Sequence, residues 1–165
     1  MLRSKNPLGV VPPAIVTAGL LALTLLIPAA SHAGPIGWNL AGGRYDNLTG
    51  TDHPTFVSFG PRVSLASFIL IPSAEWLFVD GGDLYTLNVD AAMVVVPAGV
   101  ASGWVGGGVG FRTATPDNGG STTVRTTNLL AGVGLNVIPF KPYAQIKWVL
   151  EDGQKPVAIS AGVRF

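Results

Sequence analysis

The chain has 165 residues, of which 48% are hydrophobic and 12% are charged, and it contains no cysteine. The lack of cysteine excludes a disulfide framework, thiol catalysis and a lipid anchor on a cysteine side chain. The formal net charge of +1 gives no reason to expect a nucleic-acid partner. The length allows one domain.

The first segment is typical of a cleavable secretory signal peptide. Arg3 and Lys5 form a positive start, residues 10–30 form an apolar run, and Ser31 and Ala33 are the small residues that precede a cleavage site. A membrane-spanning helix is the alternative, because such a helix needs about 20 apolar residues. Three prolines interrupt the run, however, and the small residues follow at once. We therefore predict cleavage after Ala33, with a signal peptide over 1–33.

The predicted mature chain, residues 34–165, contains eight runs in which bulky apolar side chains alternate with small or polar ones. A period of two indicates strands with two different faces. The predicted strands cover residues 37–45, 56–66, 68–79, 84–96, 101–113, 126–138, 140–151 and 155–165. The predicted fold class is all-β.

The connections between these strands point to a transmembrane barrel. The predicted outer loops are residues 46–55, 80–83, 114–125 and 152–154, and the predicted inner turns lie near Ser67, residues 97–100 and Pro139. Transmembrane barrels combine an even number of strands with short periplasmic turns and longer outer loops. We therefore predict an eight-stranded antiparallel up-and-down barrel over 34–165.

One face of the predicted strands combines glycines with a nearly balanced set of charges. An eight-stranded barrel has room inside only for packed side chains, and charges removed from water must be paired and hydrogen-bonded. The predicted polar network of the lumen consists of Arg62, Glu75, Asn88, Asp90, Arg112, Gln145, Lys147 and Arg164. This network can fill the lumen, and lining a narrow pore is the alternative.

The other face carries aromatic residues, which fall into two rings when the strands are oriented by their loops. The predicted periplasmic ring contains Trp38, Phe68, Phe140 and Phe165. The predicted outer ring contains Phe59, Trp76, Phe78, Tyr85, Phe111 and Trp148. Aromatic girdles around an aliphatic band indicate a surface that faces lipid.

Three segments resemble a known family: Ser-Gly-Trp-Val-Gly-Gly-Gly-Val-Gly-Phe-Arg at 102–112, Lys-Pro-Tyr-Ala-Gln-Ile-Lys-Trp-Val-Leu-Glu-Asp-Gly at 141–153, and the last strand ending on Phe165. The mature chain is similar to the small outer-membrane barrels of the OmpA, OmpX and opacity type. The resemblance implies a barrel in outer-membrane lipid and a final strand whose Phe165 is read by the bacterial barrel-assembly machinery. It does not imply one activity.

No catalytic residue, metal site or cofactor is expected. Some small outer-membrane barrels are lipid A hydrolases with His, Ser and a carboxylate near the outer rim, but the single mature histidine, His53, lacks the family's His-x-Ser motif. Asp80 and Asp83 are too few ligands for a cation site. The glycines at 106–108 lack the spacing and the following helix of a phosphate loop.

We therefore expect a non-enzymatic, monomeric outer-membrane protein with a structural or surface-interaction role and a filled, polar, salt-bridged lumen. The alternatives are a small outer-membrane channel and a soluble periplasmic barrel that binds lipid. The last strand should pair with the seventh through the hairpin at 151–155 and with the first near Trp38. Barrel closure is therefore the structural prediction to check.

Overall fold

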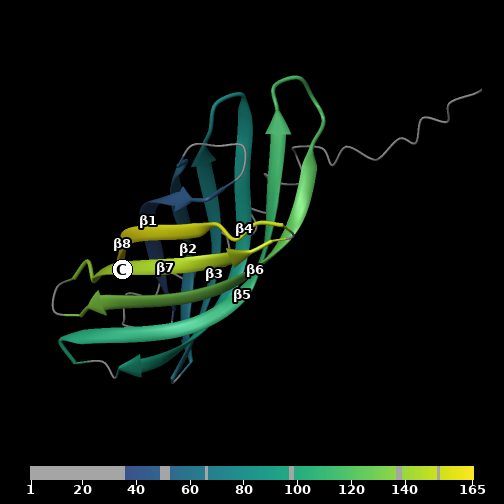
Figure 1. Ribbon diagram of the computed structural model, residues 1–165. Helices are drawn as coiled ribbons and strands as arrows, with labels where there is room; N and C mark the ends of the chain where they lie inside the picture. Colours follow the sequence, from purple (N-terminus) through teal and green to yellow (C-terminus); the bar gives the residue numbers. More distant parts are fainter. Residues whose placement is uncertain (1–35, 49–52, 66, 97–98, 137–138, 152) are drawn as a thin grey trace, which may run out of the picture. The chain divides into compact units, whose positions relative to one another are not determined.

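The computed structural model describes residues 36–48, 53–65, 67–96, 99–136, 139–151 and 153–165. These form a closed barrel of eight strands in sequence order, each antiparallel to its neighbours (Figure 1). The strands are β1 (Ile36–Asp46), β2 (Thr55–Leu65), β3 (Phe68–Phe78), β4 (Gly82–Val96), β5 (Ala101–Pro116), β6 (Thr122–Leu135), β7 (Pro142–Leu150) and β8 (Val157–Arg164). The predicted fold class is confirmed, whereas the predicted signal peptide and its cleavage site lie outside the described residues.

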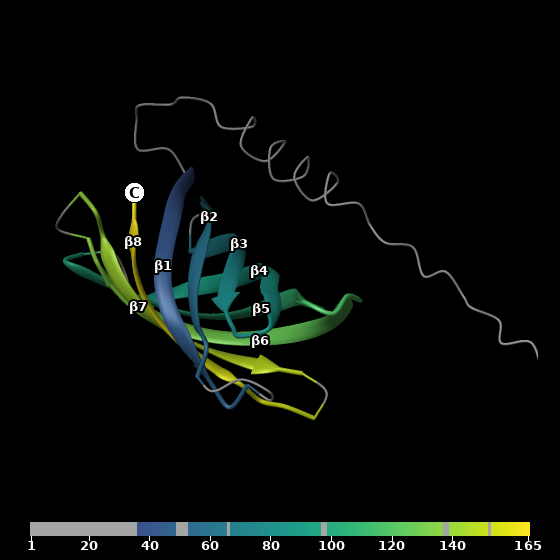
Figure 2. The same ribbon diagram turned by 90° about the horizontal axis from the view of Figure 1, so that it is seen from above.

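Pairing between β1 and β8 closes the barrel, as Figure 2 shows. The register runs from Asn39 opposite Arg164 to Asp46 opposite Val157. Beyond it, the Trp38 amide donates to the Phe165 carbonyl at 2.7 Å, and the Phe165 amide donates to the Trp38 carbonyl at 3.0 Å. The predicted closure near Trp38 is therefore confirmed. No helix of the described ranges is long and apolar enough to cross a membrane.

The connection between β5 and β6 is much shorter than predicted. Residues 114–125 were expected to form an outer loop, but pairing continues to Ala114 opposite Thr122 and leaves only 117–121 between the strands. The reason lies in the threonines of this segment, because β-branched side chains favour strands. Figure 1 shows the β5–β6 hairpin, like the β3–β4 hairpin, rising beyond the ends of neighbouring strands.

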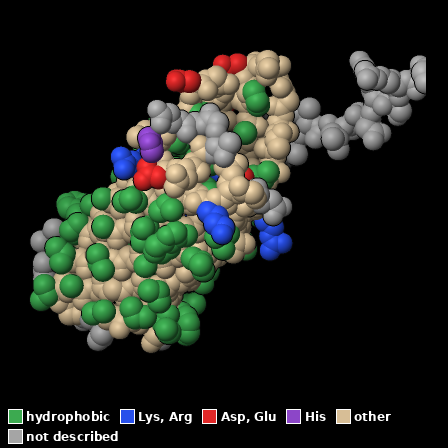
Figure 3. All heavy atoms as spheres, viewed as in Figure 1, with side chains coloured by type: hydrophobic (Ala, Val, Ile, Leu, Met, Phe, Trp, Pro, Cys, Tyr) green, Lys and Arg blue, Asp and Glu red, His purple; other side chains and the backbone are tan. Residues whose placement is uncertain are grey.

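Large apolar side chains cover the outer wall of the barrel. Phe68, Phe78 and Phe140 are each about 60% exposed, and aliphatic residues such as Val89 and Leu129 lie exposed between the aromatic ones. Figure 3 shows these hydrophobic side chains over the wall, with charged side chains gathered toward the upper end of the view. A soluble monomer rarely exposes contiguous apolar patches of more than a few hundred Å², so this wall is suited to lipid.

One pair of aromatic residues departs from the predicted two rings. Trp38 and Phe59 were assigned to opposite ends of the barrel, but their rings stack with centroids 4.8 Å apart. Phe59 faces Leu40 in the β1–β2 register and is thus diagonal to Trp38. Diagonal neighbours on one face of a sheet lie within reach of aromatic side chains. The assignment of Phe59 to the outer ring was therefore wrong. Neighbouring barrel strands are tilted and staggered, so the position of a residue along its strand does not give its height along the barrel axis.

The β2–β3 ladder contains a gap at two prolines. Its register runs from Thr55 opposite Phe78 to Phe59 opposite Ala74, and it resumes unshifted at Val63 opposite Leu70. The interval places Pro61 opposite Pro72, and neither residue has an amide hydrogen to donate. The missing ladder bonds follow from this pairing.

Gly60 allows the close approach of backbones at this gap. A Cβ at Gly60 would overlap the Pro72 carbonyl and lie 2.8 Å from the Ser73 Cα atom. We expect Gly60→Ala to lower the free energy of unfolding by about 1–3 kcal/mol, because β3 must move. Urea unfolding in detergent micelles, followed by circular dichroism, measures the cost. Gly42→Ala is the matched control, since a Cβ there is 3.8 Å from its nearest atom; equal losses in both variants would contradict this explanation.

Candidate functional site

The interior of the barrel is built in layers. An apolar cluster near the outer end consists of Tyr45, Leu48, Phe56, Leu77, Leu84, Val149 and Ala158. A second apolar cluster, nearer the periplasmic end, consists of Ile69, Ile71, Ala92, Trp104 and Leu130. Charged side chains occupy the same strands between them: Glu75 lies between Ile71 and Leu77 on β3, and Asp90 between Leu84 and Ala92 on β4.

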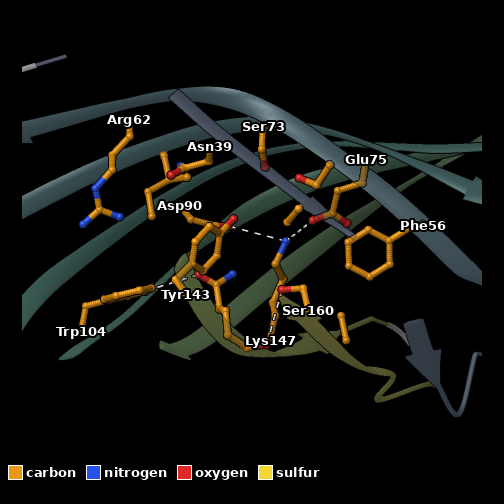
Figure 4. A pocket seen from close by; sticks show the side chains of 15 residues that line it. Asn39, Phe56, Arg62, Ser73, Glu75, Asp90, Trp104, Tyr143, Lys147 and Ser160 are labelled. Carbon is orange, nitrogen blue, oxygen red and sulfur yellow. Dashed lines mark hydrogen bonds and ion pairs between the residues drawn. The ribbon is translucent and has the colours of Figure 1, made fainter. Parts of the chain in front are cut away.

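Lys147 on β7 is the centre of the charged layer, as Figure 4 shows. Its Nζ atom donates a hydrogen bond to Glu75 Oε1 and lies 3.7 Å from Asp90 Oδ2. All three side chains are buried, with 4% or less of each residue exposed. One cation thus bridges carboxylates from two neighbouring strands across the lumen, and buried charges are tolerated only with such partners.

The neutral amide of Asn128 is a further partner of Asp90. Asn128 Nδ2 on β6 lies 2.9 Å from both Asp90 Oδ1 and Asn88 Oδ1. The carboxylate therefore accepts a hydrogen bond from β6 while Lys147 reaches its other oxygen from β7. Buried polar groups are stable when hydrogen-bonded in this way, and these contacts connect β4, β6 and β7 across the interior.

Tyr45 extends the network toward the outer end of the lumen. Its hydroxyl donates to Glu75 Oε2 at 2.5 Å, and its ring lies 5.2 Å from the guanidinium carbon of Arg112. Arg112 Nη1 in turn lies 2.6 Å from Glu151 Oε2. Both carboxylates are thereby paired, and the aromatic ring of Tyr45 separates the two ion pairs.

Removing the Tyr45 hydroxyl should measurably weaken this arrangement. We expect Tyr45→Phe to lower the free energy of unfolding by about 1.5–3 kcal/mol, the range for a hydrogen bond to a charged group. Urea titration of the refolded protein gives the value. Tyr85→Phe on the outer wall provides a control, because the Tyr85 hydroxyl makes no side-chain hydrogen bond among the described residues. A Tyr45→Phe variant as stable as the parent would show that the bond to Glu75 contributes nothing.

A different cluster occupies the periplasmic half of the lumen. Trp104 on β5 is 1% exposed, and its Nε1 donates to Gln145 Oε1 at 3.3 Å. The guanidinium carbons of Arg62 and Arg164 lie 5.3 and 5.2 Å from its ring centroid, within cation–π range. Tyr143 packs against the same indole with centroids 5.9 Å apart. Trp104 therefore fills this half of the barrel.

A small cavity of about 30 Å³ lies between the charged layer and the Trp104 cluster. Its wall includes Lys147, Glu75 and Trp104, together with small polar residues such as Ser58 and Ser160. A cavity needs a volume of about 10–15 Å³ to hold one water molecule, so this one has room for about two water molecules. No bulky substrate fits there.

The described residues of the rim include one histidine. His53 lies at the exposed outer end, where its Nδ1 atom is 2.9 Å from Asp46 Oδ1. Within the described ranges, no group of three or more histidine, aspartate or glutamate side chains is arranged to hold a metal ion.

The structure places all eight residues of the predicted lumen network on inward-facing strand positions, but in two clusters. Glu75, Asn88, Asp90 and Lys147 are joined around one cation, and Arg112 adjoins them through Tyr45. Arg62, Gln145 and Arg164 gather around Trp104 instead. Sequence reasoning did not select Tyr45 or Trp104, although both share the strand face of the polar residues.

No protein-family model matches the chain, and no curated protein sequence matches it. Solved structures do match. Neisserial surface protein A (NspA) is 15% identical with a TM-score of 0.61, covering 78% of this chain and 94% of that one. A de novo designed transmembrane β-barrel is 18% identical with a TM-score of 0.50, covering 82% and 100%. Ail, the attachment invasion locus protein of Yersinia pestis, is 22% identical with a TM-score of 0.49, covering 79% and 96%. The chain has the fold of the small eight-stranded outer-membrane barrels.

Proposed function

We propose that this protein is an integral outer-membrane barrel with a closed lumen and a structural or surface-interaction role, and that it is not an enzyme. The observation that carries the proposal is the inverted arrangement of side chains: apolar on the outer wall, and charged groups paired inside between two apolar clusters. A soluble lipid-binding barrel needs the opposite arrangement, with its apolar face inside. An apolar outer wall is stable in contact with the hydrocarbon chains of membrane lipid.

The remaining parts of the proposal concern export and assembly. Residues 1–33 act as a signal peptide that is cleaved after Ala33, and the barrel-assembly machinery reads the final strand through Phe165. Phe165 is 53% exposed beside Trp38, so an assembly factor can reach its ring. The inserted protein is a monomer in outer-membrane lipid, with no nucleic-acid partner and no cofactor.

The surface role rests on the outer hairpins. Asp80, Asp83 and Asp117 are exposed on the β3–β4 and β5–β6 hairpins, which rise beyond neighbouring strands (Figure 1). Asp83 lies on β4, and Asp80 and Asp117 lie in the short turns that join paired strands, so little freedom is lost when a partner binds them. The likeness to a Neisserial surface protein supports this role without identifying a ligand.

A small channel is the second candidate, and the internal cavity is the observation that favours it. The two apolar clusters oppose it, because hydrophobic constrictions block ions by excluding water. The ion pairs of Lys147 and Arg112 also occupy the path with side chains from opposite strands. We therefore place the closed barrel first.

Membrane fractionation of cells that express the full chain tests the proposal. The protein should sediment with the outer membrane, and it should migrate faster on an unheated gel than after boiling, because a folded barrel resists detergent. Phe165→Ala is the companion variant and should reduce the amount of folded protein in that fraction. Recovery of the wild-type protein free in the periplasm would refute membrane residence.

A further inference from the structure

Two arginine side chains lie against the same indole ring at the periplasmic end of the lumen, and neither has an aspartate or glutamate partner among the described residues. Arg62 lies opposite Gly37, near the start of β1, and Arg164 lies at the end of β8. Both guanidinium carbons are within 5.3 Å of the Trp104 ring centroid. Among the described residues, neither forms an ion pair with an aspartate or glutamate side chain. Trp104 therefore holds two like charges in one part of the lumen.

The acidic side chains of the interior all lie in the other layer. Glu75, Asp90 and Glu151 surround the cations Lys147 and Arg112. Figure 4 shows the Arg62 guanidinium on the far side of the cavity from the Lys147–Glu75 pair. The four basic and three acidic side chains of the interior nearly balance, but the two arginines at the periplasmic end have no acidic side chain beside them. Arg62 is half-buried and Arg164 is buried, so water screens the repulsion between their like charges only in part.

The hydrogen-bonding groups at this end are also incompletely used. Arg164 donates to the carbonyls of Leu135 and Lys141 at 3.3 and 3.4 Å and to Asn136 Oδ1 at 3.3 Å. Arg62 makes no hydrogen bond within the described part of the chain, although a guanidinium carries five N–H donors. A ring face offers a cation electrostatic attraction, but it accepts no conventional hydrogen bond.

Neighbouring buried polar atoms lack partners as well. Asn39 Oδ1 and Ser102 Oγ have no hydrogen-bond partner in the described residues, and each residue is 7% exposed. Asn39 lies opposite Arg164 in the β1–β8 register and lines the same cavity as Arg62. Ser102 lies opposite Gly134, where an added Cβ would meet the Arg164 guanidinium. The Ser102 hydroxyl can donate to an anion, whereas Asn39 Oδ1 only accepts and is suited to a donor such as water.

We propose that Arg62 and Arg164 bind a phosphate group at the periplasmic end of the lumen. Two guanidinium charges match a phosphate, which carries about −1.5 to −2 at neutral pH, and guanidinium groups bind phosphate oxygens through paired N–H donors. The Ser102 hydroxyl provides a further hydrogen bond. Free phosphate and a phospholipid headgroup of the inner leaflet both offer phosphate oxygens to such donors, although the phosphodiester of a headgroup carries a single negative charge.

Thermal unfolding of the purified barrel in detergent tests the site. A ligand that binds only the native state raises the midpoint in a saturable way, so sodium phosphate should raise it above sodium chloride at equal ionic strength. Arg62→Gln should abolish this rise and should also raise the midpoint in chloride, because the repulsion with Arg164 is removed. Arg125→Gln, on the exposed outer part of β6, should keep the phosphate response.

A second arm distinguishes the source of the phosphate. The same variants are unfolded, without free phosphate, in phosphatidylglycerol nanodiscs and in nanodiscs of digalactosyldiacylglycerol, a lipid without phosphate. An Arg62-dependent rise in phosphatidylglycerol indicates a headgroup, and a rise confined to soluble phosphate indicates the free anion. Equal wild-type midpoints in all conditions, or a rise that persists in Arg62→Gln, would overturn the site. Because the test needs only the folded barrel, its failure leaves the proposed outer-membrane role untouched.

Discussion

Replacing Lys147 by methionine is expected to lower the free energy of unfolding by about 3–5 kcal/mol, the usual cost of removing one partner from a buried ion pair. Methionine keeps the length and most of the volume of the side chain, so packing is retained while the charge is lost. Glu75 and Asp90 would then face each other in the lumen with no cation between them. Urea unfolding in micelles, followed by circular dichroism, measures the loss.

Removing the carboxylate charges together with the lysine should restore much of that stability. The triple variant Lys147→Met, Glu75→Gln and Asp90→Asn leaves no uncompensated charge, and replacing a whole buried ion network is often nearly neutral. We therefore expect it to be more stable than Lys147→Met alone. If Lys147→Met cost less than about 1 kcal/mol, as exposed salt bridges do, water would have access to the charged layer.

Replacing Trp104 by alanine is expected to cost about 3–5 kcal/mol, the range for a large aromatic residue removed from a core. The indole fills the periplasmic half of the lumen and contacts both Arg62 and Arg164. Its removal leaves two guanidinium groups without their aromatic partner. The folded fraction on an unheated gel, measured across a urea series, gives the change without relying on tryptophan fluorescence.

Trp76→Ala is the matched control for this experiment. Trp76 lies on the outer wall, is 56% exposed and packs against Tyr85 with ring centroids 6.3 Å apart. Its truncation removes the same number of atoms but leaves no internal cavity. We expect a smaller loss than for Trp104, and the reverse order would mean that the lumen is not packed around Trp104.

The architecture could be predicted from the sequence because inward-facing and outward-facing side chains alternate along every strand of a barrel. The alternation from Val157 to Arg164 placed Ala158 and Arg164 inside, where both are buried. The closure of the barrel was predicted from the same strand: Phe165, which follows β8, forms backbone hydrogen bonds with Trp38 as expected. Barrel topology is easily predicted when each strand connects to the next by a short hairpin.

The composition of the lumen was harder to predict. Period-two reasoning separated an apolar face from a polar face, but the inward face also carries Tyr45, Trp104, Leu77 and Ile69. The interior of a narrow barrel needs apolar packing as well as paired charges. The alternation of faces along a strand does not reveal how apolar and charged layers follow one another along the barrel axis. Arg62 lies beside Trp104 and not beside the acidic side chains. This location depends on the register between strands far apart in the sequence, which the sequence of one strand does not reveal.

Planar lipid bilayer recording of the refolded protein most directly tests the closed, filled lumen. Two apolar clusters and a paired charge layer predict no stable conductance for the wild-type protein, at either polarity and in concentrated potassium chloride. Trp104→Ala provides the comparison, since it removes the largest side chain from the lumen and should permit brief openings. Steady, reproducible wild-type conductance that changes ion selectivity in Arg62→Gln or Glu75→Gln would contradict the closed barrel and establish a channel.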